Sequence, residues 1–252
     1  VENGAWTWTP VPTGGESAYD IATHLTVKDG AMFTVDGGTF FANEYRGVFA
    51  LGGEDNATTS TLSVVSGLFD FLGANTISAH LSVNPGGRLE ISGDGVAKFR
   101  GSNQSIGLYG KGGTIDVSGS GRLELCGGDG RWFGGDTTFR ENAVLVTTGR
   151  ASDGGRPRAY LTPPAAGETM EILFKDHARV GVTEGALVSD YFYRLTLGNG
   201  IAGTTTKLTL AGDGVYNLGN FVEVGLAAGR GELRQSSGTA NLASSRGLAV
   251  GT

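Results

Sequence analysis

Short segments with an apolar residue at every second position recur along the whole chain. Each segment is followed by a few turn residues that include glycine, and then by another alternating segment. Residues 81–95 (LSVNPGGRLEISGDG) and 115–130 (IDVSGSGRLELCGGDG) show the pattern clearly. An alternation of period two predicts β-strands that bury one face, and glycine suits corners where φ is positive.

The unit recurs at irregular intervals. Copies start at Leu25, Leu62, Leu81 and Ile115, which are 37, 19 and 34 residues apart, and the offset of 34 also aligns Glu90 with Glu124. Propeller blades would recur every 40–50 residues or so, and sandwiches and barrels need longer strands joined by hairpins. Irregular spacing is typical of a coil whose corners carry insertions.

The pattern therefore predicts an all-β protein, a parallel β-helix (solenoid) with short strands and Gly-rich corners. We expect residues 1–252 to form a single solenoid, with more regular repeats in 1–150, a protruding loop at 151–167 and looser repeats in 168–252. Residues 168–179 also admit a helix, but the alternation of Met170, Ile172 and Phe174 favours a strand. We expect five phenylalanines to stack in the core: Phe33, Phe69, Phe71, Phe99 and Phe133.

Composition narrows the functional classes. The chain has 45 glycines among its 252 residues without a period of three, which excludes collagen. A net charge of −6 with scattered basic residues argues against nucleic acid as a partner. Without a run of 18 apolar residues, we expect no membrane insertion by this segment. Cys126 is the one cysteine, so an intrachain disulfide is excluded, and we expect it to be a small buried residue.

Candidate metal ligands are sparse. His24 and His80 precede Leu25 and Leu81 at equivalent repeat positions, and we expect them to lie on the surface. Two histidines without a third ligand do not make a metal site. The recurring Asp-Gly pairs lack the strict spacing of calcium-binding repeats, so turn chemistry explains them. These pairs begin at Asp29, Asp36, Asp94, Asp129, Asp153 and Asp213. We therefore predict no metal and no cofactor.

Candidate catalytic carboxylates occupy the middle, outward position of their strands: Asp70, Glu90, Asp116 and Glu124. Polysaccharide hydrolases built on β-helices need such carboxylates in pairs. Glu90 and Glu124 share a repeat position, which predicts that they stack. Arg88 and Arg122 stand beside them, so an ordinary solvent-facing surface is the competing interpretation, and we assign no catalytic residue.

The last stretch carries a family resemblance. Val222-Glu-Val224-Gly225, then Gly229-Arg-Gly231-Glu-Leu233, then Leu248-Ala-Val250-Gly251 resemble the β-strand repeats of autotransporter passenger domains, as does the opening Trp6-Thr7-Trp8-Thr9. The resemblance implies a right-handed parallel β-helix, export, and a place on a bacterial cell surface or in the medium. It implies no particular activity.

These observations favour a non-catalytic, secreted or cell-surface bacterial β-solenoid with a structural or adhesive display role. The expected partners are glycans or components of a host or cell surface. Two alternatives stay open, a polysaccharide lyase or hydrolase and a self-assembling extracellular filament subunit. Residues 248–252 end in mid-repeat, which predicts either a fragment of a longer protein or end-to-end self-association.

Overall fold

Parallel strands make up the fold. The computed structural model describes residues 5–8, 18–21, 26–44, 48–53, 57–73, 80–100, 107–126, 129–148, 158–161, 168–180, 194–198, 202–225 and 229–251. In those ranges the strands form a 19-stranded sheet and a 4-stranded sheet, and each strand pairing is parallel. The expectation of an all-β chain with parallel pairing is confirmed.

The strands lie in columns that we call first, second and third. The first column contains β1 (Ala5–Trp8), β4 (Met32–Glu44), β6 (Ser60–Gly73), β8 (Gly87–Ile91), β11 (Thr114–Val117), β14 (Thr137–Phe139), β17 (Thr169–Phe174), β20 (Thr205–Leu210) and β22 (Arg230–Gln235). The second contains β2 (Ala18–Ile21), the later halves of β4 and β6, β9 (Val96–Arg100), β12 (Arg122–Cys126), β15 (Val144–Thr148), β18 (Arg179–Val180), and the first parts of β21 (Val215–Val224) and β23 (Thr239–Val250).

The third column has two parts. Its early part contains β3 (Thr26–Val27), β5 (Val48–Leu51), β7 (His80–Val83) and β10 (Gly107–Gly110). Its later part contains β13 (Asp129–Phe133), β16 (Arg158–Leu161), β19 (Arg194–Leu197) and the last parts of β21 and β23. β16 lies inside the segment 151–167 that was predicted as a loop, so that segment contains a paired strand; residues 151–157 and 162–167 fall outside the described ranges.

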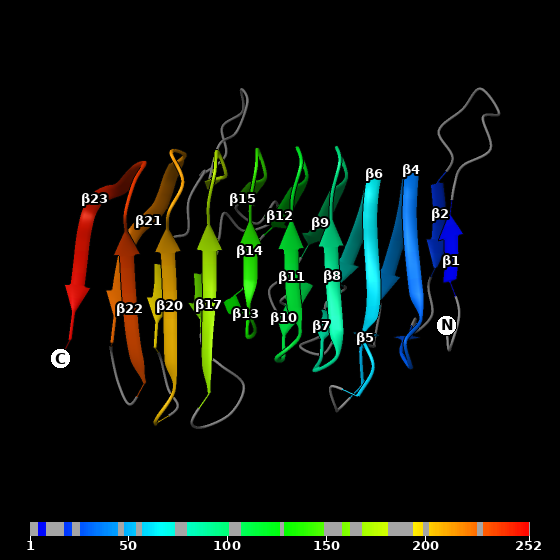
Figure 1. Cartoon of the computed structure of the whole chain (residues 1–252), viewed down its shortest axis with the longest axis horizontal. Coiled ribbons are helices and arrows are strands. Elements are labelled where there is room, and N and C mark those ends of the chain that lie inside the picture. Colours follow the sequence, from blue (N-terminus) through cyan, green and yellow to red (C-terminus); the bar gives the residue numbers. More distant parts are fainter. Residues whose placement is uncertain are drawn as a thin grey trace.

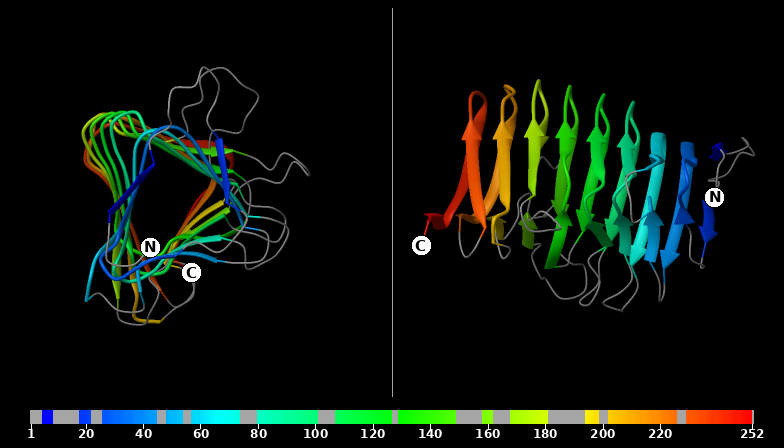
Figure 2. Two further views of the ribbon diagram at one scale, coloured as in Figure 1. Left: turned by 90° about the vertical axis from the view of Figure 1, so that its right-hand side faces the viewer. Right: turned by 60° about the horizontal axis from the view of Figure 1, so that its bottom comes forward.

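The columns run the length of the molecule (Figure 1), and buried residues from all three form one hydrophobic core. Seen along the long axis, strands from different parts of the chain overlie one another (Figure 2). Register partners are 22 residues apart at Ile115 and Thr137 and 36 apart at Ile172 and Leu208. Strands β4, β6, β21 and β23 continue from one column into the next, so they are longer than the short strands predicted.

In-register pairing sorts the side chains into rows. Alternate residues of a strand point to the same face, and a parallel partner in register adds its own residue directly alongside. One inward row of the first column therefore consists almost entirely of buried apolar residues: Val35, Val64, Ile91, Val117, Phe139, Phe174 and Leu210. Burying these rows is the main favourable term in the fold.

Aromatic side chains fill the wider parts of the interior. Phe33, Phe69, Phe71, Phe99 and Phe133 are all at most 1 % exposed, which confirms their assignment to the core. The rings of Phe69 and Phe99 are 6.0 Å apart, and those of Phe139 and Phe174 stack at 4.6 Å with an angle of 4° between them.

The corner between the first and second columns is a stack of four-residue turns, at residues 92–95, 118–121, 140–143 and 175–178. Within a turn, the Gly95 N–H donates to the Ser92 carbonyl at 2.9 Å; between turns, the Ser120 N–H donates to the Gly93 carbonyl at 2.7 Å. The second residue of each turn has a positive φ, of +58° at Gly93 and +57° at Asp176. That conformation explains the glycine-rich corners.

The predicted 34-residue alignment is wrong as a guide to stacking. Glu90 pairs in register with Asp116, whereas Glu124 lies between Lys98 and Val146 in the second column. Residues 81–91 lead from the third column to the first, and residues 115–126 lead from the first to the second. The two segments look alike because each is a strand, a tight corner and a strand, at different corners of the stack. Leu25 lies outside the described ranges, but the alignment that starts at Leu25 and Leu81 matches the structure from the next residue on, since Thr26 pairs with Ala50 and Ala50 with Ser82.

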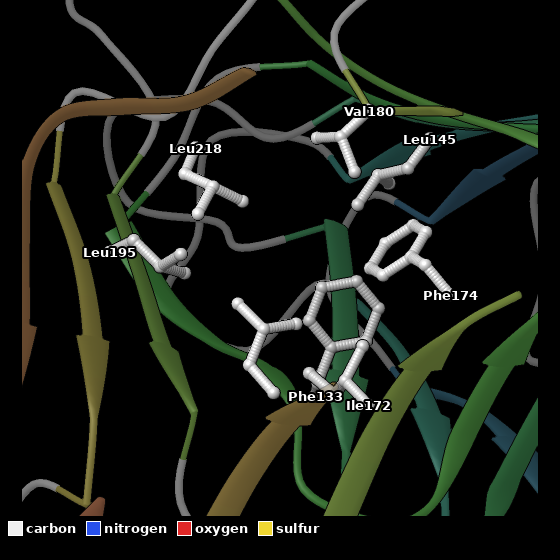
Figure 3. Close-up of a pocket in the computed structure, with 8 residues that line it drawn as sticks. Phe133, Leu145, Ile172, Phe174, Val180, Leu195 and Leu218 are labelled. Atoms are coloured by element: carbon white, nitrogen blue, oxygen red, sulfur yellow. The ribbon is translucent and has the colours of Figure 1, made fainter. Parts of the chain in front are cut away.

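The interior also has a small apolar cavity of about 20 Å³. It is lined by Phe133, Leu145, Ile172, Phe174, Val180, Leu195, Leu208 and Leu218, of which seven are labelled in Figure 3. The labelled side chains come from all three columns and point toward one another (Figure 3). A space of this size without polar groups is a packing gap and not a ligand site.

Replacing a stacked ring tests the importance of the apolar rows. We expect Phe139→Ala to lower the free energy of unfolding by about 3–5 kcal/mol, because it removes a buried ring and leaves a cavity beside Phe174. The measurement is urea unfolding followed by circular dichroism. Val65→Ala is the matched control, because Val65 is 37 % exposed at a corner and should change stability by less than about 0.5 kcal/mol. Equal effects of the two substitutions would contradict packed rows.

Tyr216 gives the fold a dependence on alkaline pH. Burial raises the pKa of its phenol above 10.0, and the nearby backbone of Gly212 and Gly214 offsets part of the shift. The phenol therefore ionises at a higher pH in the folded protein than in the unfolded chain. Its contribution to the free energy of unfolding is complete below the pKa of the unfolded chain and is lost as the pH rises above that value. We expect Tyr216→Phe to remove part of the loss of stability above pH 10, measured by urea unfolding across that range. An unchanged pH profile would show that Tyr216 does not contribute.

Candidate functional site

Charged side chains cover the outward side of the first and second columns near the middle of the chain. We call this surface the charged face. It consists of Asp70, Arg88, Glu90, Lys98, Arg100, Asp116, Arg122, Glu124, Arg140 and Glu141. The strands β6, β8, β9, β11 and β12 supply most of it because their alternate residues point away from the interior.

Asp116 lies at the centre of the part of the charged face that belongs to the first column. Arg88 Nη2 lies 3.4 Å from Glu90 Oε1 and 3.3 Å from Asp116 Oδ2, so one guanidinium bridges two carboxylates. Arg140 approaches from the next turn, with Nε 3.3 Å from Asp116 Oδ1. Its hydrogen bond to Asp116 raises the pKa of Arg140 above the usual value, against a smaller opposing effect of burial.

The part of the charged face that belongs to the second column contains two shorter ion pairs. Arg100 donates from Nε and Nη2 to the two oxygens of Asp70 at 2.8 and 3.0 Å, which is the bidentate geometry of strong ion pairs. Arg100 also lies over the ring of Phe41, 5.3 Å from its centre. Glu124 is held by Arg122 at 2.6 Å and Lys98 at 3.7 Å.

The structure thus brings together some of the predicted carboxylates and separates others. Glu90 and Asp116 are neighbours, whereas Glu90 and Glu124 occupy different columns and do not stack. Asp70, Glu90, Asp116 and Glu124 each form an ion pair with at least one basic side chain. Glycoside hydrolysis needs one carboxyl group that carries a proton and another that is free to act as a base or nucleophile. Here each of the four carboxylates contacts an arginine or lysine side chain, so the geometry suits structural ion pairs better than acid–base chemistry.

Three outward residues of the third column are buried, which the alternation pattern did not reveal. Ser82, Thr196 and Glu223 are at most 3 % exposed. The Thr196 hydroxyl donates to Glu223 Oε2 at 2.8 Å, so the buried carboxylate has a hydrogen-bond donor. His80 is also buried, at 8 % exposure, so its expected surface position is wrong; His24 lies outside the described ranges.

The corners hold most of the Asp-Gly pairs. Asp29 has a φ of +57° in a turn closed by the Ala31 N–H and the Lys28 carbonyl at 3.1 Å, as turn chemistry predicts. Asp213 lies 2.6 Å from Nδ1 of His177, its neighbour in the stacked corner.

Across the described ranges, no group of three or more His, Cys, Asp or Glu side chains could hold a metal ion. Asp153 falls outside those ranges, and Cys126 is half-buried instead of buried as expected.

A surface groove of about 240 Å³ lies where the third column meets the first. Its lining consists of Gly112, Thr114, Gly134, Gly135, Asp136, Glu168, Thr169 and Met170. The floor is glycine because the backbones touch there: a Cβ on Gly134 would lie 2.0 Å from the Gly110 carbonyl oxygen. Asp136 Oδ1 accepts a hydrogen bond from the Glu171 N–H at 2.8 Å. The alternation pattern did not predict this groove; its one local signal in the sequence is the run Gly134-Gly135-Asp136.

Comparisons with known proteins add no relative. No protein-family model, curated protein or solved structure matches the chain. The class that the described residues define is an all-β protein with a large parallel sheet that nearly closes around its interior. They contain no helix long and apolar enough to cross a membrane.

Asp116 provides a test of the charged face. We expect Asp116→Asn to lower the free energy of unfolding by about 1 kcal/mol at low salt, because two arginines lose a charged partner. In about 1 M NaCl the difference should shrink, since charges are screened beyond about 3 Å. The exposed corner residue Asp94 gives the control, Asp94→Asn. A loss of stability that is the same at both salt concentrations would contradict an electrostatic role.

Proposed function

We propose that this chain is a right-handed parallel β-helix of a secreted or cell-surface bacterial protein, and that its role is structural or adhesive display. The resemblance of residues 222–251 to autotransporter passenger repeats supports the handedness and the export. The parallel columns and their single interior support a coiled chain, because a strand and its register partner are separated by enough sequence for one turn of a coil.

The observation that best supports a non-catalytic role is the ion pairing of the carboxylates on the charged face. The four carboxylates predicted as catalytic candidates are each held by arginine or lysine. Such pairs keep an exposed sheet hydrated and discourage association along its face. A stiff stack with a polar surface is suited to holding loops at its corners for contact with glycans or with components of a host or cell surface.

A polysaccharide lyase or hydrolase is the second candidate function, and the groove favours it. The groove places Asp136 and Glu168 beside Thr114 and Thr169 over a floor of glycine. Hydroxyl and carboxylate groups of this kind hydrogen-bond sugar hydroxyls. Asp136 and Glu168 are the two carboxylate residues of the lining, and the Asp136 carboxylate accepts a hydrogen bond from the Glu171 N–H.

One set of assays distinguishes the two functions. The purified chain is incubated with neutral and acidic polysaccharides, and reducing ends and unsaturated products are measured; retention on the same immobilised glycans is measured in parallel. A display protein should release no product and should bind equally well after the double substitution Glu90→Gln and Glu124→Gln. Shortening of a polysaccharide that is abolished by Glu168→Gln would contradict display and establish the enzyme.

A further inference from the structure

The groove between the third and first columns exists because two neighbouring strands begin at different levels. β14 begins at Thr137, which pairs with Ile172 in β17. β17 begins earlier, at Thr169, and within the described ranges its residues 169–171 pair with β20 alone. The edge of β17 that faces β14 is therefore open along these residues, in the middle of the stack.

Two backbone N–H groups point from this open edge toward the groove. The Glu171 N–H donates to Asp136 Oδ1 at 2.8 Å, so a side chain takes the place of a strand partner there. The Glu168 carbonyl accepts from the Thr205 N–H of β20 at 3.0 Å. Because the C=O and N–H of one trans peptide unit point in opposite directions, the Thr169 N–H points away from β20 and toward the groove that Thr169 lines. The edge thus offers a backbone donor to a ligand.

The side chains of the rim supply further donors and acceptors. Thr114, Asp136 and Thr169 are exposed and lie in three consecutive layers of the first column. Thr114 lies beside Asp136, since the residues that follow them, Ile115 and Thr137, pair in register. A threonine hydroxyl both donates and accepts, and a carboxylate accepts at both oxygens. Asp136 forms no ion pair with any described residue, unlike the carboxylates of the charged face, so it keeps acceptor capacity for a ligand.

The size and charge of the groove limit the class of ligand. Its volume of about 240 Å³ is below the roughly 300–1,000 Å³ of pockets for drug-sized ligands, so it suits a unit as small as one sugar residue. The charged side chains of its lining are Asp136 and Glu168, which disfavours an acidic sugar. An ammonium group only donates and would leave the Thr169 N–H without an acceptor, whereas a sugar hydroxyl both donates and accepts.

From the open edge of β17, the exposed hydroxyls and the carboxylate without an ion pair, we propose that this groove binds one residue of a neutral sugar. Sugar hydroxyls accept from the Thr169 N–H and donate to the Asp136 carboxylate. The floor of Gly112, Gly134 and Gly135 carries no side chain, so the sugar can approach the backbone. The proposal rests on the display function, because it names the class of glycan that is contacted and the place of contact.

Titration of the isotope-labelled chain with D-glucose, D-galactose and D-mannose tests the proposal, with nuclear magnetic resonance as the readout. We expect at least one of these neutral sugars to shift the amide resonances of Gly112 and Gly135 saturably, with a Kd on the order of millimolar. Galacturonate, which is acidic, and glucosamine, which carries an ammonium group, should bind more weakly in the same titration.

A double substitution tests the part played by the rim. Thr114→Val with Thr169→Val removes two hydroxyls at nearly constant shape and should weaken binding of the neutral sugar by about 10-fold. Both residues are exposed, so the variant should fold, which circular dichroism checks. Thr34→Val, in the first column but outside the groove, is the matched control and should bind as the wild type does.

Three results would overturn the proposal: no neutral sugar shifts the groove amides, galacturonate or glucosamine binds there more tightly, or the double variant binds as well as the wild type. Any of these results, combined with no product in the polysaccharide assays, leaves display in place without this groove. Product release in those assays together with neutral-sugar binding in the groove would instead contradict display and leave the groove as a sugar site. The two proposals therefore fail separately.

Discussion

In-register parallel pairing is the constraint on which the rest of the structure depends. Once a strand lies beside its partner without a shift, each side chain lies beside the equivalent side chain of the next layer, and rows of like residues follow. Apolar rows such as Val64, Ile91 and Val117 then bury one another without any layer needing a core of its own. A one-residue slip would expose the whole row, so the register is strongly specified.

The corners maintain this register. A turn of four residues whose second residue has a positive φ recurs between the first and second columns, and backbone hydrogen bonds link each turn to the next. Glycine fits because no Cβ can be accommodated where backbones touch: one on Gly214 would lie 1.9 Å from the Ala178 carbonyl oxygen. Where the conformation falls on Glu141 or Asp176, side chains help: the Glu141 N–H donates to Asp176 Oδ2 at 3.1 Å. Insertions between columns change the spacing of repeats without disturbing the stack.

Much of the fold could be predicted from the sequence, because alternation and corner glycines are local signals. The core phenylalanines, the strand at 169–174 and the absence of helix across the described ranges follow from them. The stacking partners could not be predicted as well. Each corner uses similar residues, so the likeness of 81–95 to 115–130 did not show which column each segment joins. The burial of Ser82, Thr196 and Glu223 also escaped prediction, since alternation gives the side of a strand and not what covers that side. The carboxylates of the charged face were predicted from their outward strand positions. The arginines that bridge them could not be predicted, because those contacts join residues of different layers.

Distances between layers test the central claim most directly. Spin labels at Thr34, Thr138 and Thr209 lie in one outward row of the first column, four strand spacings and then two more apart. With about 4.8 Å per layer, pulsed electron resonance should give about 19 Å from Thr34 to Thr138 and about 29 Å from Thr34 to Thr209. Distances that do not increase in this order, as antiparallel hairpins would give, would contradict a chain built by stacking parallel strands in register.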